Sequence, residues 1–282
     1  MYATVGSTDI FYTVAGAGLP YLVPSLAGTP IYERTFTLAL GGTLQLIFAE
    51  LRANRTAVRD VAALTLRALT EDMDALRQAL GLERLAVLGH SAHSILALAY
   101  AAHFPQRISR VIIVGGLPAL SPTLHEQIAG YWEVVAPPDR KQLLAENRAR
   151  LTDEVLERLT PSERLTVTYA ADGPLYFYDP TYDCTPLWAG HDDFSWELYQ
   201  RFWGPGGQSA TFDLDGSFPR IVALVFIAHG VFDFSVAPTV WVGIKDQLPS
   251  QTYHAFERSG HYPQMEERAT FSGAVAAWLL RG

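Results

Sequence analysis

Cysteine is nearly absent from this sequence: Cys184 is the single one among 282 residues. An intrachain disulfide is therefore impossible, which is compatible with a reducing cytoplasm. The histidines also lack a metal-binding spacing, with no His-x-x-x-His on a helical segment. We expect a protein that holds no metal ion.

Long hydrophobic runs are also lacking. No apolar run approaches the ~20 residues that cross a bilayer as a helix. The N-terminal stretch MYATVGSTDIFYTVAGAGLPYLVPSL has no basic start and no unbroken apolar block. Its apolar residues alternate around Gly and Asp, as they do in short strands. The sequence thus predicts no signal peptide and no membrane contact, and we expect a soluble cytoplasmic protein.

Positive charge is in deficit, with 21 basic against 29 acidic residues and a net charge of −8. Phosphate backbones repel such a chain when it has no basic cluster, so nucleic-acid binding is not expected. The Gly-x-Gly of AGAGLP is followed by Pro20 and opens no helix, and no Walker loop is present. We therefore expect no cofactor and a small-molecule partner. The oligomeric state stays open.

Apolar residues are abundant, at 49% of the chain. Short apolar segments predict buried strands, and segments of helical periodicity separate them. The predicted strands are Thr8–Val14, Tyr21–Pro24, Leu44–Leu51, Leu85–Gly89, Arg110–Gly116, Arg220–Gly230 and Gln251–Phe256. The predicted helices are Asp60–Leu80, Ser94–Phe104 and Ala269–Leu280. This alternation is typical of an α/β fold, a parallel sheet with helices on both faces.

The segment 117–212 has little strand character, and several parts of it have helical character. It contains four of the six tryptophans, Trp132, Trp188, Trp196 and Trp203. We predict a core formed by residues 1–116 and 213–282, interrupted by a helical insertion at 117–212. The aromatic residues either form the insertion's own core or line a pocket over the site described next.

The stretch RLAVLGHSAHSILALAYAAHFP places Ser91 between a strand and a helix that Pro105 ends. A serine nucleophile needs a base within reach, a group that orients this base, and donors for the developing oxyanion. A tight strand-to-helix turn exposes the hydroxyl and directs helix N–H groups at the reacting atom. The alternative is a serine that only caps the helix.

With this strand, turn and helix, the chain resembles the α/β-hydrolase superfamily, and within it the proline iminopeptidase-like branch. The resemblance spans nearly the whole sequence and is firmest at Leu85–Gly115 and Ile221–Glu267. It implies the α/β-hydrolase fold: a mostly parallel central sheet flanked by helices, with a helical cap as the insertion.

The resemblance also implies the other catalytic groups. In FIAHGVFDFSVAP the acid is Asp233, with Asp246 as an alternative. In FERSGHYPQMEE the base is His261, with His229 and His254 as alternatives. The order Ser91, Asp233, His261 is the order that this fold uses.

Two backbone N–H groups are expected to form the oxyanion hole. One belongs to Ala92, which follows the serine. The other lies in PSLAGTPIY and belongs to Thr29, or alternatively to Gly28. This loop departs from the family pattern, because Ala27 stands where relatives have a histidine.

Two further departures lie near the serine. The segment ELRANRT, Glu50–Thr56, lacks the glycines of the family's corresponding loop. His93 occupies the second small position of the turn. We expect His90 to pack or hydrogen-bond near the turn. His93 has either a structural role at the helix start or a supporting role near Ser91.

The resemblance implies a cofactor-free serine hydrolase acting on a carboxylic ester or amide, with His90, Trp188, Trp196 and Glu197 near the substrate. The alternative is an aminopeptidase that releases N-terminal proline, whose substrate ammonium needs carboxylates such as Asp192, Asp193 and Glu197. A ligand receptor or a lyase on the same fold is a further alternative, because fold alone does not fix function.

Overall fold

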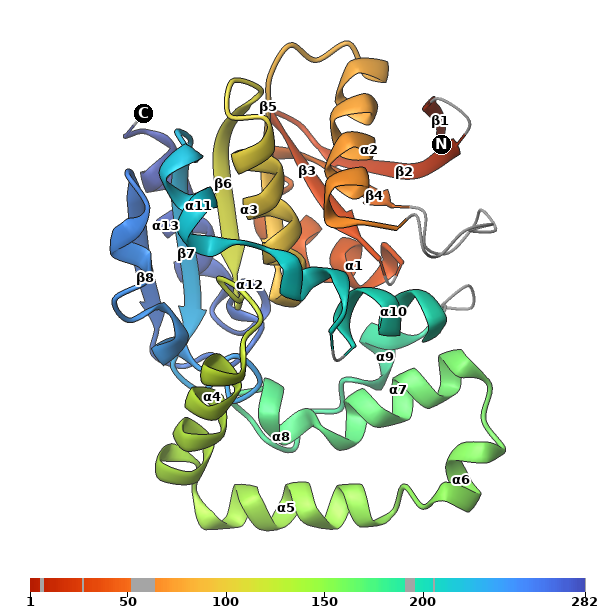
Figure 1. Cartoon of the computed structure of the whole chain (residues 1–282). Helices are drawn as coiled ribbons and strands as arrows, with labels where there is room; N and C mark the ends of the chain where they lie inside the picture. The colour runs from red at the N-terminus through yellow and green to blue at the C-terminus, as the bar shows by residue number, and fades with distance from the viewer. Residues whose placement is uncertain (6–7, 27, 52–63, 191–195, 205, 282) are drawn as a thin grey trace.

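The computed structural model describes residues 1–281 except 6–7, 27, 52–63, 191–195 and 205 (Figure 1). Its eight-stranded sheet has the order β1-β2-β4-β3-β5-β6-β7-β8. The neighbours from β4 to β8 pair in parallel, and β1–β2 and β2–β4 pair antiparallel. The expected mostly parallel sheet is confirmed. The strands are β1 (Tyr2–Val5), β2 (Thr8–Gly16), β3 (Leu19–Ser25), β4 (Leu44–Glu50), β5 (Leu85–His90), β6 (Ile108–Val114), β7 (Leu224–Gly230) and β8 (Gln251–Phe256).

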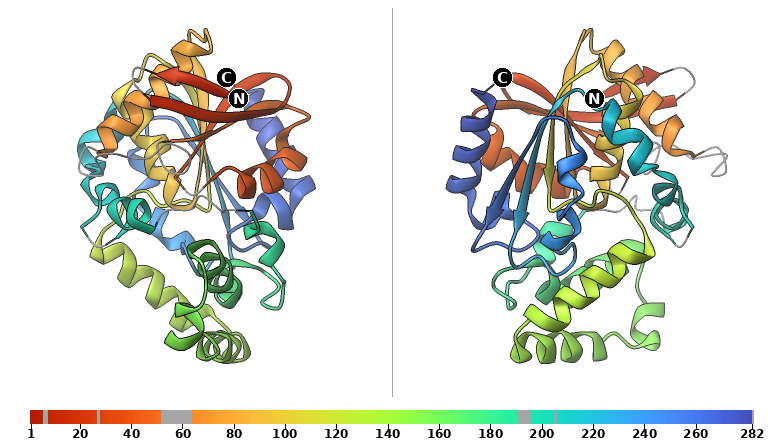
Figure 2. Two further views of the ribbon diagram at one scale, coloured as in Figure 1. Left: turned by 90° about the vertical axis from the view of Figure 1, so that its right-hand side faces the viewer. Right: turned by 60° about the vertical axis from the view of Figure 1, so that its left-hand side comes forward.

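Helices cover both faces of this sheet, as the two views in Figure 2 show. Along β5, Leu85 and Val87 point to one apolar cluster, and Ala86 and Leu88 point to the other. The first cluster includes α2 (Leu66–Ala79) and α3 (Ser94–His103). The second includes α1 (Pro30–Leu40) and α13 (Arg268–Leu279), and the short α12 (Pro263–Glu266) precedes α13. Alternate side chains of each parallel strand therefore enter different layers of the core.

The remaining helices stand between β6 and β7 in the chain. In Figure 1 most of them lie below the sheet, at the edge where the parallel strands end. They are α4 (Pro122–Val135), α5 (Pro138–Ala149), α6 (Asp153–Glu157), α7 (Pro161–Ala171), α8 (Gly173–Tyr176), α9 (Thr185–Trp188), α10 (Trp196–Trp203) and α11 (Leu214–Ser217). Within the described part of 117–212 no strand is found, which agrees with the weak strand signal there.

Three elements differ from the sequence-based expectation. Strand β1 and helix α1 were not expected, although Pro30 and Glu33 in the first turn of α1 are helix-start signals. The strand expected from Arg220 begins at Leu224, because Phe218–Arg220 forms a 3-10 turn with a proline near its start.

The helix expected from Asp60 is described only from Leu66. The Thr65 hydroxyl caps it by accepting the Ala68 N–H at 3.1 Å. Residues 60–63 lie outside the described residues. Among the helices that the structure describes, none has both the length and the apolar character needed to cross a bilayer.

The crossing of β5 and α3 requires glycine at position 89. A Cβ on Gly89 would lie 2.6 Å from the Ser94 Cα and 2.9 Å from the Ala97 Cβ. Both distances are well inside van der Waals contact. The strand can therefore turn into the helix within the short 3-10 segment Ser91–His93 only because residue 89 has no side chain.

We predict that Gly89→Ala lowers the free energy of unfolding by about 1–3 kcal/mol, because the added methyl overpacks a rigid crossing. Urea unfolding followed by circular dichroism measures this change. Gly273→Ala is the matched control: Gly273 lies in α13, and no described atom outside the backbone of its own helix lies within 4 Å of the position of a Cβ. That change should stabilise the protein by roughly 0.5–1 kcal/mol. Equal stability of Gly89→Ala and the wild type would contradict the close crossing.

Candidate active site

Ser91 stands at the end of β5 with a backbone φ of 55°, and it is the one non-glycine residue with positive φ among those described. Holding a residue with a Cβ in this left-handed region costs on the order of 1–3 kcal/mol. The Ser94 hydroxyl donates to the Ser91 carbonyl oxygen at 2.6 Å and so helps to hold the turn. The N-cap of α3 is His93, so Ser91 does not have the capping role that the sequence left open.

His261 and Asp233 form a buried hydrogen-bonded pair. The His261 Nδ1 lies 2.7 Å from the Asp233 Oδ2, and the two side chains are 2% and 0% exposed. The other carboxylate oxygen, Oδ1, accepts the N–H groups of Ser235 at 3.0 Å and Val236 at 2.8 Å. Because Oδ2 can only accept here, the hydrogen of a neutral imidazole is on Nδ1. The lone pair is then on Nε2.

Two backbone contacts fix the loop that carries His261. The His261 N–H donates to the Tyr176 carbonyl oxygen at 2.6 Å. The His90 Nε2 donates to the His261 carbonyl oxygen at 3.0 Å. His90 therefore orients His261 through the backbone, which agrees with the expectation that it hydrogen-bonds near the turn.

Burial shifts the pKa values of this pair in opposite directions. Loss of hydration raises the pKa of the Asp233 carboxyl, and the neighbouring His229 and the two backbone N–H groups offset part of this rise. Loss of hydration lowers the pKa of the His261 imidazole. As the pH falls, the carboxylate of this pair therefore gains a proton before the imidazole does.

The alternative acid and bases are not among the residues that line the cavity next to Ser91. Asp246 is exposed and pairs with Lys245 at 2.7 Å. His229 is fully buried, with its Nε2 at 3.5 Å from the Asp233 Oδ2 and at 2.5 Å from the Val236 carbonyl oxygen. His229 thus contacts the Asp233 carboxylate but does not line the cavity described next. His254, in β8, does not line it either.

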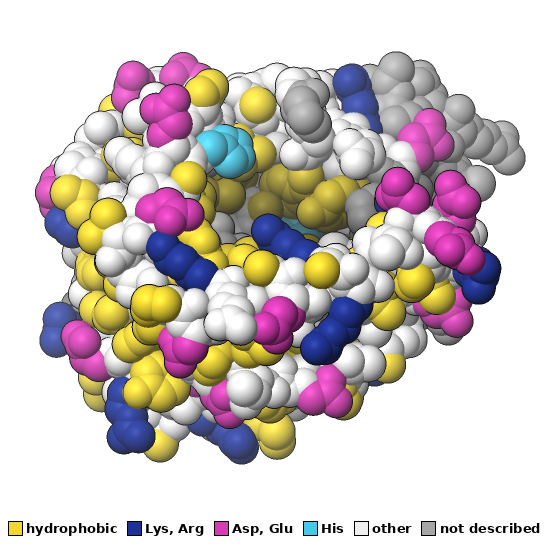
Figure 3. Space-filling model, turned by 90° about the horizontal axis from the view of Figure 1, so that it is seen from below, with side chains coloured by type: hydrophobic (Ala, Val, Ile, Leu, Met, Phe, Trp, Pro, Cys, Tyr) yellow, Lys and Arg dark blue, Asp and Glu magenta, His cyan; other side chains and the backbone are white. Residues whose placement is uncertain are grey.

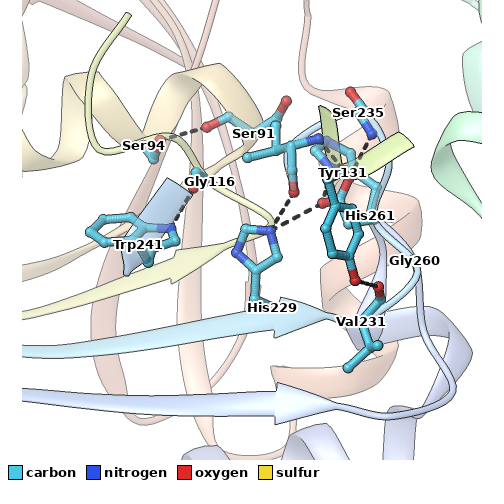
Figure 4. Close-up of polar contacts among 12 residues, drawn as sticks. Ser91, Ser94, Gly116, Tyr131, His229, Val231, Ser235, Trp241, Gly260 and His261 are labelled. Carbon is cyan, nitrogen blue, oxygen red and sulfur yellow. Dashed lines mark hydrogen bonds and ion pairs between the residues drawn. The ribbon is translucent and has the colours of Figure 1, made fainter. Parts of the chain in front are cut away.

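Ser91 and His261 line one cavity of about 180 Å³. They reach it from different elements, the turn before α3 and the loop after β8 (Figure 4). No described hydrogen bond joins the two side chains, and such bonds often tighten only when substrate binds. The residues around the cavity are mainly aromatic and apolar: Ile31, Tyr32, His90, His93, Leu117, Leu165, Tyr169, Tyr176, Trp188, Tyr199, Trp203, Ser235, Val236 and Tyr262.

Aromatic residues from the helices between β6 and β7 form one wall of this cavity. Tyr169 of α7 and Trp188 of α9 stack with ring centroids 3.8 Å apart. Figure 3, a view from below, shows a hollow on this side of the molecule with hydrophobic side chains in it. Trp132 instead packs edge-on against Phe234 at 5.2 Å. Tyr169, Trp188 and Trp203 thus line the pocket, as one of the two interpretations expects, whereas Trp132 packs on the loop after β7.

The predicted substrate contacts in α10 receive less support. Glu197 is exposed and is not among the residues that line the cavity. Trp196 begins α10, but its side chain lies outside the described part of the structure, as do Asp192 and Asp193. His90 and Trp188 do line the cavity.

Two N–H groups of the loop after β3 are bonded to side chains of the protein itself. The Thr29 N–H donates to Oε1 of the buried Glu50 at 3.2 Å. This bond occupies the group that the sequence pattern assigns to the oxyanion. The Leu26 N–H donates to Nε2 of His93 at 2.9 Å. Gly28 has φ 88°, a conformation suited to glycine, and its carbonyl oxygen accepts the Ser25 hydroxyl at 2.6 Å.

The sequence did not reveal the hydrogen bonds that His93 makes with the loop after β3 and with Tyr32. His93 is 6% exposed, and its ring joins the turn after β5 to the loop after β3. Its Nδ1 lies 2.7 Å from the Tyr32 hydroxyl oxygen. The one signal in the sequence was the departure of position 93 from a small residue. Nothing in the sequence pointed to Tyr32.

A larger cavity, of about 710 Å³, lies elsewhere and shares no lining residue with the first. Residues of α1, α12 and the start of α13 border it. Arg34 at its edge donates to the carbonyl oxygens of Leu187 and Ala189, at 2.8 and 2.7 Å. No group of three or more potential metal ligands occurs among the described residues.

Comparisons with known proteins agree on the family. A family model described as alpha/beta hydrolase fold matches residues 62–268. The AB hydrolase superfamily protein YclE of Bacillus subtilis (strain 168) is 26% identical over 274 residues, covering 96% of this chain and 95% of that protein. A proline iminopeptidase of Heyndrickxia coagulans is 26% identical over 223 residues, covering 74% and 71%.

Among solved structures, the proline iminopeptidase of Mycobacterium smegmatis aligns with a TM-score of 0.76 at 19% identity. The alignment covers 100% of this chain and 97% of that one, and it concerns the fold alone. The family model spans well over half of the chain, and the sheet order, the turn at Ser91 and the helices on both faces are consistent with it. The protein therefore belongs to the alpha/beta hydrolase fold family.

Proposed function

We propose that the protein is a serine hydrolase that cleaves a small carboxylic ester through an acyl-enzyme intermediate. The observation that carries this proposal is the buried His261–Asp233 pair beside the cavity that Ser91 enters on a strained turn. Strained residues and buried titratable pairs concentrate at functional sites, because neither stabilises a fold efficiently.

In the first half-reaction, Nε2 of His261 removes the proton from the Ser91 hydroxyl as Oγ bonds to the substrate carbonyl carbon. The resulting imidazolium then gives this proton to the leaving alcohol oxygen as the C–O bond breaks. Asp233 stabilises the imidazolium and holds its Nδ1–H in place. The products of this step are a free alcohol and an ester of Ser91.

In the second half-reaction, His261 takes a proton from water, and the water oxygen bonds to the acyl carbon. The bond between this carbon and the Ser91 Oγ breaks, and the proton returns to Oγ. The carboxylic acid leaves and the starting enzyme is restored. In both halves the N–H of Ala92 serves as one oxyanion donor, because it follows the nucleophile at the start of a helix.

The cavity suits an uncharged acyl group better than an amino acid with a free ammonium. Its described lining residues include no Asp or Glu, and its walls are largely aromatic. At about 180 Å³ it is smaller than the pockets that hold drug-sized ligands. The aminopeptidase alternative is supported by relatives of that name, and its carboxylates would have to come from Asp192 and Asp193.

We further propose that the helices between β6 and β7 act as a cap, within the boundaries 117–212. Tyr169, Trp188 and Trp203 all come from this segment and all line the cavity. The segment thus supplies the wall that faces Ser91, and it excludes water from the reacting groups.

Ser91→Ala should abolish covalent labelling by a fluorophosphonate probe and lower kcat for p-nitrophenyl acetate by at least about 10³-fold, because no other group supplies the nucleophile. Gel fluorescence and p-nitrophenol release measure the two effects. Ser272→Ala on α13 is the control and should behave as the wild type. Labelling that persists without Ser91 would refute the proposed nucleophile.

We expect p-nitrophenyl acetate to be a far better substrate than proline β-naphthylamide, because no described carboxylate in the cavity can receive an ammonium. The comparison of kcat/KM for the two compounds tests this. A preference for the proline derivative that disappears when Asp192 and Asp193 are replaced by Asn would instead establish the aminopeptidase.

The kcat/KM of ester hydrolysis should fall as the pH drops through about 7, the value to which burial raises the pKa of Asp233. A protonated Asp233 carries no charge to stabilise the imidazolium that His261 forms during catalysis, so the decline should approach tenfold per pH unit. A pH–rate profile with a non-ionising ester, and circular dichroism to verify folding, measures it. Undiminished activity at pH 5 would contradict this titration.

A further inference from the structure

The hydrogen bonds of His93 determine where its own hydrogen lies. The Leu26 N–H can only donate, so Nε2 of His93 accepts at 2.9 Å. Burial lowers the pKa of His93 to about 3, so the ring is neutral and its hydrogen is on Nδ1. Nδ1 then donates to the Tyr32 hydroxyl oxygen, 2.7 Å away.

This chain of bonds leaves the hydroxyl hydrogen of Tyr32 available. The Tyr32 oxygen accepts from His93, and no described residue accepts the hydrogen that this hydroxyl carries. The side chain is 6% exposed and lines the cavity together with Ser91. Burial also raises its pKa, so the hydroxyl stays protonated at any working pH.

Tyr32 lies over the turn that presents the serine. Its ring contacts the rings of His90 and His93 edge-on, with centroids 5.7 Å apart in each case. These two histidines flank Ser91 in the sequence. The ring of Tyr32 thus contacts both neighbours of the nucleophile and lines the same small cavity.

The site also needs a donor at this position. Hydrolysis through Ser91 develops negative charge on the carbonyl oxygen, and enzymes commonly place two donors there. The Thr29 N–H, which was expected as the second donor, is bonded to Glu50. The Leu26 N–H is bonded to His93.

We propose that the Tyr32 hydroxyl donates a hydrogen bond to the oxygen of the carbonyl that Ser91 attacks. Tyr32 is then a catalytic residue of this hydrolase, and His93 is a positioning residue that fixes the hydroxyl oxygen and tethers the loop after β3. This inference rests on the proposed function. It also explains why a histidine stands where a small residue is expected at position 93.

The test is Tyr32→Phe, assayed with p-nitrophenyl acetate. Loss of one donor to the oxyanion should lower kcat by about 10²-fold and leave KM within about threefold, since the bond strengthens in the transition state. Tyr21→Phe is the matched control. The Tyr21 hydroxyl is buried in β3, has no hydrogen-bond partner among the described residues and lies outside the cavity, so this variant should retain wild-type kinetics.

His93 is tested through its dependence on Tyr32. His93→Ala should also lower kcat, and His93→Gln should recover part of the loss, because an amide can accept from Leu26 and donate to Tyr32. In the Tyr32→Phe background, His93→Ala should cost much less than it does alone, since the two groups act together. Additive losses would show that His93 does not act through Tyr32.

Ser91→Ala is assayed together with Tyr32→Phe, so that a failure of this inference can be told from a failure of the proposed function. If Ser91→Ala is inactive and Tyr32→Phe retains wild-type kcat, or changes KM alone, the role of Tyr32 is wrong and the hydrolase stands. If the wild type itself neither turns over the ester nor reacts with the fluorophosphonate, both are wrong. A large fall in kcat with unchanged thermal unfolding of Tyr32→Phe supports the inference.

Discussion

The hydrogen bond between His261 and Asp233 is the contact on which the account of this site depends. A carboxylate removed from water is costly unless its oxygens are satisfied, and Asp233 has the N–H groups of Ser235 and Val236 together with the imidazole. These bonds determine which nitrogen of His261 carries the hydrogen. Without them the imidazole that lines the cavity with Ser91 would have no fixed orientation.

A second set of contacts brings the N-terminal half of the chain to the same cavity. Gly89 allows β5 and α3 to cross closely, and the strained backbone of Ser91 places a hydroxyl at that crossing. His93 then bonds both to the loop after β3 and to Tyr32 in α1. Two segments more than 60 residues apart in the sequence are thus joined by buried polar contacts, and apolar layers pack on either side of the sheet between them.

Much of this arrangement could be predicted from the sequence, because it follows from local patterns. Continuous apolar runs predict the parallel strands, and Gly89 before Ser91 predicts the turn. The spacing of Asp233 and His261 after two such strands predicts their loops at one edge of the sheet. The match to the alpha/beta hydrolase fold family agrees with the resemblance seen in the sequence.

The contacts that the sequence did not reveal depend on the three-dimensional position of single polar atoms. Whether the Thr29 N–H points to a substrate or to Glu50 depends on the path of one loop, and no periodicity encodes it. Likewise, His93 departs from the expected small residue, but its partners Leu26 and Tyr32 are more than 60 positions away in the chain. The start of β7 also differed from the strand predicted from Arg220, because the proline-containing 3-10 turn at Phe218–Arg220 overrides the apolar pattern there.

The central claim is that Ser91 carries the acyl group during turnover. It is tested most directly by quenching the enzyme in acid during steady-state hydrolysis of p-nitrophenyl acetate and mapping its peptides by mass spectrometry. The account predicts an acetyl group on the peptide that contains Ser91, and none there once the substrate is exhausted. Rapid hydrolysis with no acetyl group on Ser91, or with the group on another residue, would contradict it.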